Sequence, residues 1–295
     1  MPIHYPDILE EHSEPRTLTY VEKDIMLYAL GIGLGDDPMN EDELPFVYEK
    51  DLKAVPTAAT VLHASIGRPQ MACSRLGHRP SSVNYPMIVH GEQKIELHRP
   101  LPNSGSFRAT TRTIGAFDKG ADKGAVIINE TVWTDKSEKV VTLTGTIFAR
   151  GDGGFGGPTE GAPQPHTLPA RPPDQTLEFA TRPGQALLYR LNGDRNPLHA
   201  DPEVARRAGF NRPILHGLCT YGITCRAVLQ AITDYDPTRI LSHQVRFSSP
   251  VIPGDTIALD LWRDGDVVSF EARAKERGVT VIKNGKTVLR ARIPD

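Results

Sequence analysis

Residues 218–232 read LCTYGITCRAVLQAI, a run that is largely apolar around its whole circumference if it forms a helix. Such a helix is expected to be buried on most sides. The residues after it alternate apolar and polar positions and are rich in Val, Ile, Thr and Phe. This pattern predicts strands at 240–253, 256–263, 267–275 and 280–291. A long buried helix followed by an antiparallel sheet predicts an α+β fold, with the sheet wrapped around the helix.

An earlier part of the chain has the same order of elements. Residues 83–102 alternate in the same way and end at Pro100-Leu101-Pro102, as the later run ends at Pro250-Val251-Ile252-Pro253. Further strands are predicted at 106–116, 125–134 and 139–149. Hairpin signals are Asp118-Lys119-Gly120, Asp264-Gly265 and Asn284-Gly285. The two halves therefore read as distant copies of one unit.

The helix of the first copy is weaker. Residues 58–62 take its place, with a continuation from Ser65 that Pro69 interrupts. Between the copies, residues 151–175 are dominated by Gly and Pro and have no hydrophobic period. We predict a first unit at 1–150, a linker at 151–175 and a second unit at 176–295. The alternative is one long loop within a single domain.

Composition restricts the class of protein. The 295 residues are 39% hydrophobic and 24% charged, with a net charge of −2, so no basic field predicts a nucleic-acid partner. Three cysteines without a CxxC pair favour a reducing compartment. The sequence shows no signal peptide, no apolar run that predicts a membrane partner, and no Ser-Lys-Leu ending. We expect a cytoplasmic protein, peroxisomal only if another signal or a larger polypeptide carries it.

The chemistry is concentrated at residues 189–199, YRLNGDRNPLH. Asp194, Asn196 and His199 lie on a segment that Gly193 and Pro197 bend into a shaped loop. A carboxylate and an imidazole together can take a proton from one atom and give one to another, as the addition of water to a double bond requires. Each residue also has a plainer interpretation, as a turn residue, a loop hydrogen-bonding group or an ordinary histidine.

Gly217 lies at the start of the long helix, after His216. Its N–H is therefore expected among the unpaired donors of the first helical turn, at the positive end of the helix dipole. A fixed donor of this kind stabilises a developing oxyanion by roughly 3 kcal/mol. The plainer interpretation is a simple helix start.

The segment GDRNPLH, followed by ADPEVARRAGFNRPILHGL, resembles the hydratase 2 motif of the MaoC-like dehydratases. Residues 90–102 and the RGDGGFGG string at 150–157 resemble the two-unit members. The resemblance implies a double hot-dog fold: two curled antiparallel sheets, each around a central helix, with the N-terminal helix degraded. It also implies hydration of trans-2-enoyl-CoA to (3R)-3-hydroxyacyl-CoA in fatty-acid metabolism, by a lyase that needs no cofactor and no metal, with coenzyme A as part of the substrate.

The resemblance assigns roles to four residues. Asp194 and His199 correspond to the acid/base pair, Asn196 to the amide that helps hold the water, and Gly217 to the glycine whose N–H binds the thioester oxygen. The first half departs from the motif, because Gly35-Asp36-Asp37-Pro38 has no Asn before the proline and no following His. We therefore expect a degenerate first unit that forms the acyl tunnel and a catalytic second unit.

Substrate-binding roles are predicted for five further residues: His90, Gly91, Glu92, Tyr189 and His216. Tyr189 is expected to serve mainly in packing, and a structural role for His216 is an equal alternative. Charge alone nominates Arg68, Lys94 and Arg246 for contacts to coenzyme A.

Two other functions stay open at this stage: an acyl-CoA thioesterase, and a non-catalytic acyl-CoA-binding module of the same fold. The two units are expected to pair within the chain as a pseudo-dimer, which covers sheet edges. A homodimer of such chains is the further association that this architecture allows.

Overall fold

The computed structural model describes residues 3–62, 83–84 and 87–291. Within them the strands form one ten-stranded sheet in the order β1-β3-β4-β5-β2-β7-β10-β9-β8-β6. The first half of the chain supplies β1 (Arg16–Tyr20), β2 (Ile88–Leu97), β3 (Gly105–Asp118), β4 (Ala125–Asp135) and β5 (Glu138–Ala149). The second half supplies β6 (Gln175–Ala180), β7 (Ile240–Phe247), β8 (Thr256–Asp264), β9 (Val267–Ala274) and β10 (Val279–Leu289).

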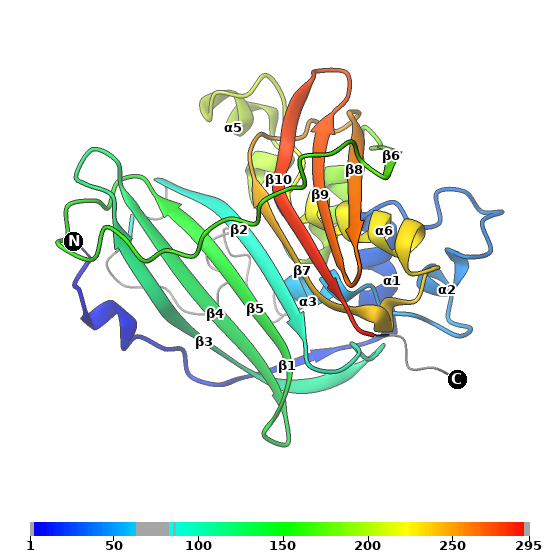
Figure 1. Cartoon of the computed structure of the whole chain (residues 1–295), viewed down its shortest axis with the longest axis horizontal. Helices are drawn as coiled ribbons and strands as arrows, with labels where there is room; N and C mark the ends of the chain where they lie inside the picture. Colours follow the sequence, from blue (N-terminus) through cyan, green and yellow to red (C-terminus); the bar gives the residue numbers. More distant parts are fainter. Residues whose placement is uncertain (1–2, 63–82, 85–86, 292–295) are drawn as a thin grey trace.

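The two halves meet where β2 and β7 pair (Figure 1). These inner strands run antiparallel, in a register from Glu92 opposite Arg246 to Glu96 opposite Ser242. We call this pairing the seam. Because the seam consists of backbone hydrogen bonds within one sheet, the strands of both halves form a continuous curved surface.

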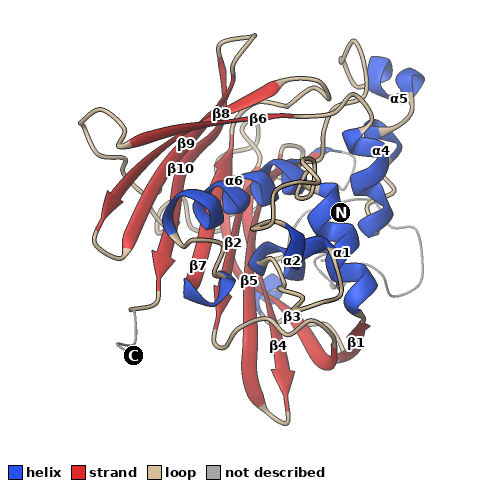
Figure 2. Cartoon of the chain, turned by 90° about the vertical axis from the view of Figure 1, so that its right-hand side faces the viewer, coloured by secondary structure: helices blue, strands red, loops and turns tan. Residues whose placement is uncertain are grey.

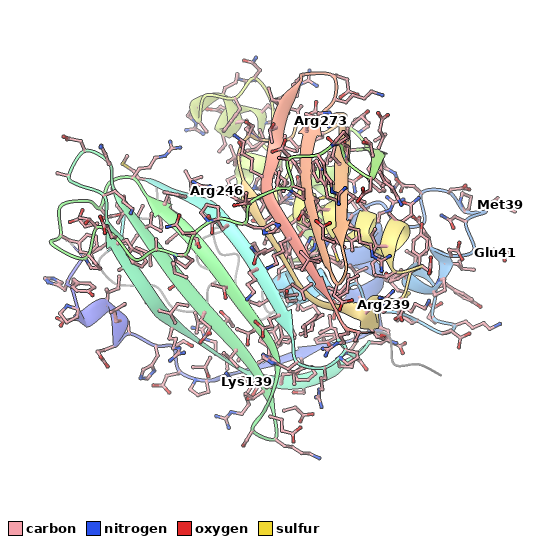
Figure 3. All side chains as sticks on the ribbon, viewed as in Figure 1. Met39, Glu41, Lys139, Arg239, Arg246 and Arg273 are labelled. Atoms are coloured by element: carbon pink, nitrogen blue, oxygen red, sulfur yellow. The ribbon has the colours of Figure 1, made fainter. Side chains whose placement is uncertain are left out.

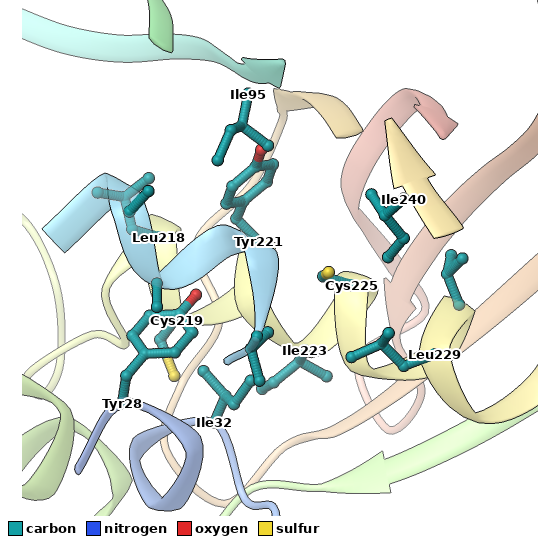
Figure 4. Packing of buried hydrophobic residues seen from close by; sticks show 14 of the residues in the cluster. Tyr28, Ile32, Ile95, Leu218, Cys219, Tyr221, Ile223, Cys225, Leu229 and Ile240 are labelled. Carbon is teal, nitrogen blue, oxygen red and sulfur yellow. The ribbon is translucent and has the colours of Figure 1, made fainter. Parts of the chain in front are cut away.

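The long helix α6 (Gly217–Ile232) packs against this sheet and contacts β7 and β10. Twelve of its sixteen residues are buried, as its apolar sequence predicts. Cys219, Tyr221, Ile223 and Leu229 point from it into the core (Figure 4). That core is one cluster with members from both halves, among them Ile95 on β2 and Val245 on β7. Each fully buried Leu, Ile or Val side chain contributes about 1.5–3 kcal/mol to stability.

Shorter helices lie on the same side of the sheet as α6 (Figure 2). They are α1 (Glu22–Gly31), α2 (Leu44–Val47), α3 (Ala59–Leu62), α4 (Gln185–Tyr189) and α5 (Pro202–Arg207). Helix α1, which the sequence patterns did not predict, packs against α4 and buries Tyr28 and Ala29 completely. Among the described residues, α3 stands where the first unit's central helix was expected, and Pro69 lies outside them. No helix in the described ranges is long and apolar enough to cross a membrane.

The α+β prediction, with a sheet wrapped around the long helix, is confirmed, but one hairpin is wrong. Asn284-Gly285 lies inside β10, where the register against β9 shifts between Ile282 and Gly285. Asn284 has a φ of 55°, and a Cβ on Gly285 would lie 2.3 Å from the Phe270 ring. The pair therefore makes a β-bulge instead of a turn. The predicted strands at 83–102, 240–253 and 280–291 are also shorter, because β2, β7 and β10 end at Leu97, Phe247 and Leu289.

Residues 150–174, all of which are described, contain no helix or strand. The start of this segment is fixed by the carboxylate of Asp118, which accepts hydrogen bonds of 2.8 Å from the backbone N–H groups of Gly120, Gly154 and Gly156. These bonds lower the pKa of Asp118 below its usual value. The glycines at 154 and 156 have φ near +80°, which other residues rarely adopt.

Candidate active site

The loop after α4 is bent by its own side chains. Gly193 has a φ of 110° and ends a short 3-10 turn, which reverses the chain. The Asp194 Oδ1 atom then accepts a 3.1 Å hydrogen bond from Asn196 N, and the Asn196 Oδ1 atom accepts one of 3.1 Å from Leu198 N. Pro197 opens the next 3-10 turn, which carries His199. The plainer role in loop geometry is therefore real for Asp194 and Asn196, and it brings the polar groups to one place.

Asp194, His199 and His216 come together in the folded protein. One side-chain N or O atom from each lies within 4.8 Å of those from the other two. All three residues are buried, with exposures of 4%, 8% and 1%. His216 Nε2 donates a 3.3 Å hydrogen bond to the backbone carbonyl of Asp194, and it lies 4.0 Å from that residue's Oδ2. In the structure, the Asp194 carboxylate and the His199 imidazole of the motif therefore lie within 4.8 Å of each other.

The protonation pattern of His199 follows from its surroundings. Its Nδ1 donates a 2.9 Å hydrogen bond to the carbonyl of Ile214, which can only accept. In the neutral ring, the proton therefore resides on Nδ1, and Nε2 keeps a basic lone pair. The His199 and His216 rings stack with centroids 3.8 Å apart and planes at 28°.

The same three groups are close enough together to be considered as metal ligands. A nitrogen ligand binds a metal along its lone pair, in the plane of its ring, and tetrahedral zinc needs four convergent donors at about 2 Å. The two imidazole rings are stacked face to face at 28°, and His216 Nε2 is already used as a donor to the Asp194 carbonyl, so the two rings do not both offer a nitrogen in a common plane. This arrangement suits proton transfer better than metal ligation.

Gly217 begins α6, as the sequence predicted, and His216 is its N-cap. The glycine is exposed, whereas twelve of the fifteen residues of the helix behind it are buried. The preceding chain is fixed by a 2.8 Å hydrogen bond from Leu215 N to the carbonyl of Val251. The exposed Gly217, at the positive end of a sixteen-residue helix, is a favourable place for an oxygen that carries negative charge.

Helix α1 supports both segments of the site from behind. The Gly31 carbonyl accepts hydrogen bonds from the side chain of Gln185, the first residue of α4, and from Cys219 Sγ on α6. A Cβ on Gly31 would lie 3.0 Å from Asn192 Nδ2 and 3.2 Å from Tyr189 Cδ2. The first half therefore contacts α4, which precedes the loop with Asp194 and His199, and α6, which begins at Gly217. The sequence gave no signal that predicts this contact.

Tyr189 lies in this packing layer. Its ring is completely buried, with centroids 6.1 Å from Tyr28 and 5.1 Å from His216. It therefore touches the Asp194–His199–His216 group through the His216 ring, which agrees with the predicted packing role.

The predicted residues of β2 lie near the seam. His90 and Glu92 are half-buried, and Gly91 between them is buried. Burial raises the pKa of Glu92, and Arg246, 3.9 Å away across the seam, opposes this rise. Lys94 pairs with Glu96 at 3.2 Å. Lys94 and Arg246, two of the three cations nominated for coenzyme A, thus each pair with a carboxylate of the same chain on a partly exposed surface. The third, Arg68, lies outside the described residues.

The first-half segment that corresponds to the motif, Gly35-Asp36-Asp37-Pro38, makes structural contacts. Gly35 N donates to Glu43, which also accepts from Arg226 of α6 at 2.8 Å. Asp36 forms an ion pair with Arg182, and partial burial of Asp36 raises its pKa against the effect of that arginine. No histidine is part of these contacts within the described residues, in agreement with the departure from the motif.

The fold and the site define a double hot-dog protein with a carboxylate–imidazole pair at the N-terminus of its central helix. Residues 18–151 match the family model "MFE-2 hydratase 2 N-terminal domain", and residues 165–285 match "MaoC like domain". The chain belongs to the MaoC-like dehydratase family, in its two-unit hydratase 2 form.

Relatives support this placement along the whole chain. "Enoyl-CoA hydratase ChsH3" of Mycobacterium tuberculosis is 38% identical over 302 residues, which cover 99% of this chain and 100% of the relative. "Enoyl-CoA hydratase 2, peroxisomal" of Arabidopsis thaliana is 37% identical over 297 residues, covering 94% and 93%.

Solved structures agree with the fold. The crystal structure of a MaoC-like dehydratase from Phytophthora capsici superposes with a TM-score of 0.85 at 36% identity and covers 97% of this chain and 98% of its own. A Mycobacterium tuberculosis protein described as a double hotdog fold has a TM-score of 0.52 at 13% identity, covering 98% and 99%, which bears on the fold alone.

Proposed function

We propose that the protein is an (R)-specific enoyl-CoA hydratase, which adds water reversibly to trans-2-enoyl-CoA in fatty-acid metabolism. The observation that carries this function is the meeting of Asp194 and His199 with His216, the N-cap residue of α6 next to the exposed Gly217. Homologues of the same length and family carry the names of enoyl-CoA hydratases. Because the substrate is an acyl-CoA thioester, coenzyme A enters as part of the substrate.

Each step of the reaction has a group to perform it. The Asp194 carboxylate and the lone pair on His199 Nε2 hold a water molecule between them, and Asn196 adds an amide contact. As the water oxygen attacks C3, one member of the pair takes its proton. Negative charge moves to the thioester oxygen, which accepts a hydrogen bond from Gly217 N–H. A proton then passes from the pair to C2, and the enzyme returns to its starting state.

The stereochemistry follows from the same arrangement. Asp194 and His199 lie on one short loop, so the hydroxyl group and the proton reach the same face of the double bond. This is syn addition, and we expect the (3R) alcohol. With crotonyl-CoA, the enoyl absorbance should fall without release of free thiol, and a (3R)-specific dehydrogenase should oxidise the product. Predominantly (3S) product would refute the assignment, and free thiol without hydroxyacyl product would identify a thioesterase instead.

The proposal includes the absence of a cofactor. Proton acceptance, proton donation and oxyanion binding are supplied by side chains and one backbone N–H, so the reaction needs no redox or Lewis-acid group. Turnover should survive dialysis against a chelator unchanged. Loss of turnover that a divalent metal restores would contradict this part of the proposal.

The division of labour is also proposed. We assign the acyl tunnel to residues 1–150, the linker to 151–175 and catalysis to 176–295. Support comes from the seam, which makes the halves an intrachain pseudo-dimer. A series of enoyl-CoA chain lengths tests the tunnel, because substitutions in the first half should change chain-length preference and leave stereochemistry intact.

Assembly and compartment complete the proposal. We expect a homodimer, which light scattering after gel filtration tests, and a cytoplasmic location, which a fluorescent fusion tests. A relative named as peroxisomal supplies the alternative for the location. A monomer, or a punctate organellar signal, would contradict these two expectations.

A further inference from the structure

Phe247, the last residue of β7, lies beside the exposed start of α6. A Cβ atom placed on Gly217 would lie 3.3 Å from Phe247 Cε1 and 3.4 Å from its Cδ1. The ring is half-buried, and Gly217 is exposed. The ring therefore lies in van der Waals contact with the position that a β-carbon would take on Gly217, the residue whose N–H is the proposed donor to the thioester oxygen.

The first half of the chain supports this ring from across the seam. The His90 ring lies 4.9 Å from the Phe247 ring, centroid to centroid, at an interplanar angle of 58°. His90 Nε2 donates a 3.1 Å hydrogen bond to the Glu92 carbonyl, which fixes the ring. This tilted contact at close range is a favourable geometry for two aromatic rings.

A β-bulge aims His90 at this position. The register of β2 against β5 shifts between His90 and Glu92, at Gly91. A side chain at Gly91 would not fit, because its Cβ would lie 2.6 Å from the Phe148 ring. Bulges redirect side chains next to active sites. Next to the bulge, Glu92 pairs across the seam with Arg246 at 3.9 Å. Figure 3 shows where Arg246 lies.

From this geometry we infer that Phe247 is a substrate-contacting residue and His90 a positioning residue that acts through it. The inference rests on the proposed function. An acceptor oxygen lies about 2.9 Å from the Gly217 nitrogen, which is one bond from the α-carbon. The atoms flanking the thioester carbonyl therefore rest against the Phe247 ring. The ring limits how far the carbonyl can move away from the N–H, and so it sets the reactive alignment of C2 and C3 with the acid/base loop.

This role divides the substrate site between the halves of the chain. The acid/base loop, the start of α6 and Phe247 come from the second half, whereas His90, which supports the Phe247 ring, comes from β2 of the first half. A second half without β2 would keep Asp194, His199 and Gly217 but lose the contact that holds Phe247 in place.

The test compares Phe247→Ala with Phe247→Leu and a matched control, Phe117→Ala. Phe117 is also a half-buried phenylalanine, and it lies on β3. On crotonyl-CoA, Phe247→Ala is expected to lower kcat roughly 10- to 100-fold, with a smaller change in KM, because misalignment weakens the reactive geometry more than binding. Phe247→Leu should lose less than Phe247→Ala, and Phe117→Ala should stay within about twofold of wild type.

A double-mutant cycle tests the support by His90. His90→Ala should lower kcat in the wild-type background but add little in the Phe247→Ala background, because its effect passes through the ring. His90→Phe, which restores an aromatic neighbour, should recover most of the loss. Additive losses would overturn the role of His90.

The outcomes separate the two proposals. If the wild-type protein does not hydrate crotonyl-CoA, the proposed function fails. If it hydrates well and folded Phe247→Ala keeps its kcat, the inference fails and the proposed function stands. If circular dichroism shows that Phe247→Ala is unfolded, the Phe247→Leu variant decides. Wild-type kcat and KM in that variant would refute the substrate-contacting role of Phe247.

Discussion

A buried histidine away from the site makes the stability of the protein depend on pH. His243 on β7 is completely buried, and its Nε2 donates a 3.0 Å hydrogen bond to Thr224 Oγ1. That hydroxyl is itself committed as a donor to the Tyr221 carbonyl, at 2.7 Å. The His243 Nδ1 atom accepts a 2.7 Å bond from Thr287 Oγ1. Burial lowers the pKa of His243 from 6.5 to about 3, so the folded protein keeps the ring neutral.

The sign and size of the effect follow from this shift. Below pH 6.5 the unfolded chain binds a proton at this position and the folded protein does not, so the free energy of unfolding falls as the pH falls. The loss is about 1.4 kcal/mol per pH unit, or about 2 kcal/mol between pH 6.5 and pH 5, and it continues towards pH 3.

The measurement is urea unfolding of wild type and His243→Gln at several pH values from 7 to 5. The substitution removes the titrating group, so its free energy of unfolding should fall by about 2 kcal/mol less than that of wild type over this range. Val245→Ala is the control, because it deletes buried methyl groups on the same strand. It should lower stability equally at all pH values. Parallel curves for wild type and His243→Gln would refute the reasoning.

Three further predictions concern turnover. Asp194→Asn and His199→Gln should each lower hydration of crotonyl-CoA roughly 100- to 10,000-fold in folded protein, and wild-type turnover in either would remove the mechanism. Asp36→Ala should leave turnover within a few-fold, because its partly exposed ion pair contributes about 1 kcal/mol or less; a large loss would mean that the active half is misassigned. Gly31→Ala should lower the free energy of unfolding by about 1–3 kcal/mol and also lower kcat, because the added methyl group presses on Tyr189. Unchanged stability and kcat, measured by thermal unfolding and turnover, would show that α1 shifts to accommodate the methyl group.

Those features whose cause is local in the sequence were predictable. Helix α6 is apolar on most sides because it is buried on most sides, and its composition alone predicts that. The alternating runs predicted strands at the positions of β3, β4, β5, β8 and β9. The sequence predicted a bent loop that carries Asp194 and His199, because Gly193 and Pro197 interrupt regular structure there, and the structure has bends at both residues.

Other features depend on contacts between distant segments and left no local signal. The Phe247 ring gains its position from Gly217 and from His90 across the seam, and nothing next to it in the sequence predicts either contact. Asn284-Gly285 looks like a hairpin turn but is drawn into β10 by pairing on both sides of that strand. Helix α1 was not predicted because its mixed sequence shows no clear apolar face. It is stabilised by packing against α4 and by a hydrogen bond from Cys219 of α6.

Because the seam joins two units of one chain, residues that face each other across it can differ, which a symmetric dimer of identical chains does not allow. When Pro100 is matched with Pro250, Lys94 corresponds to Gln244, and these two residues face each other at the centre of the β2–β7 register. In a dimer of identical chains, a residue on the twofold axis meets its own copy, and every substitution appears twice. A lysine there would face a lysine. Joined in one chain, the lysine faces an amide, and each side of the axis can change without its mirror image.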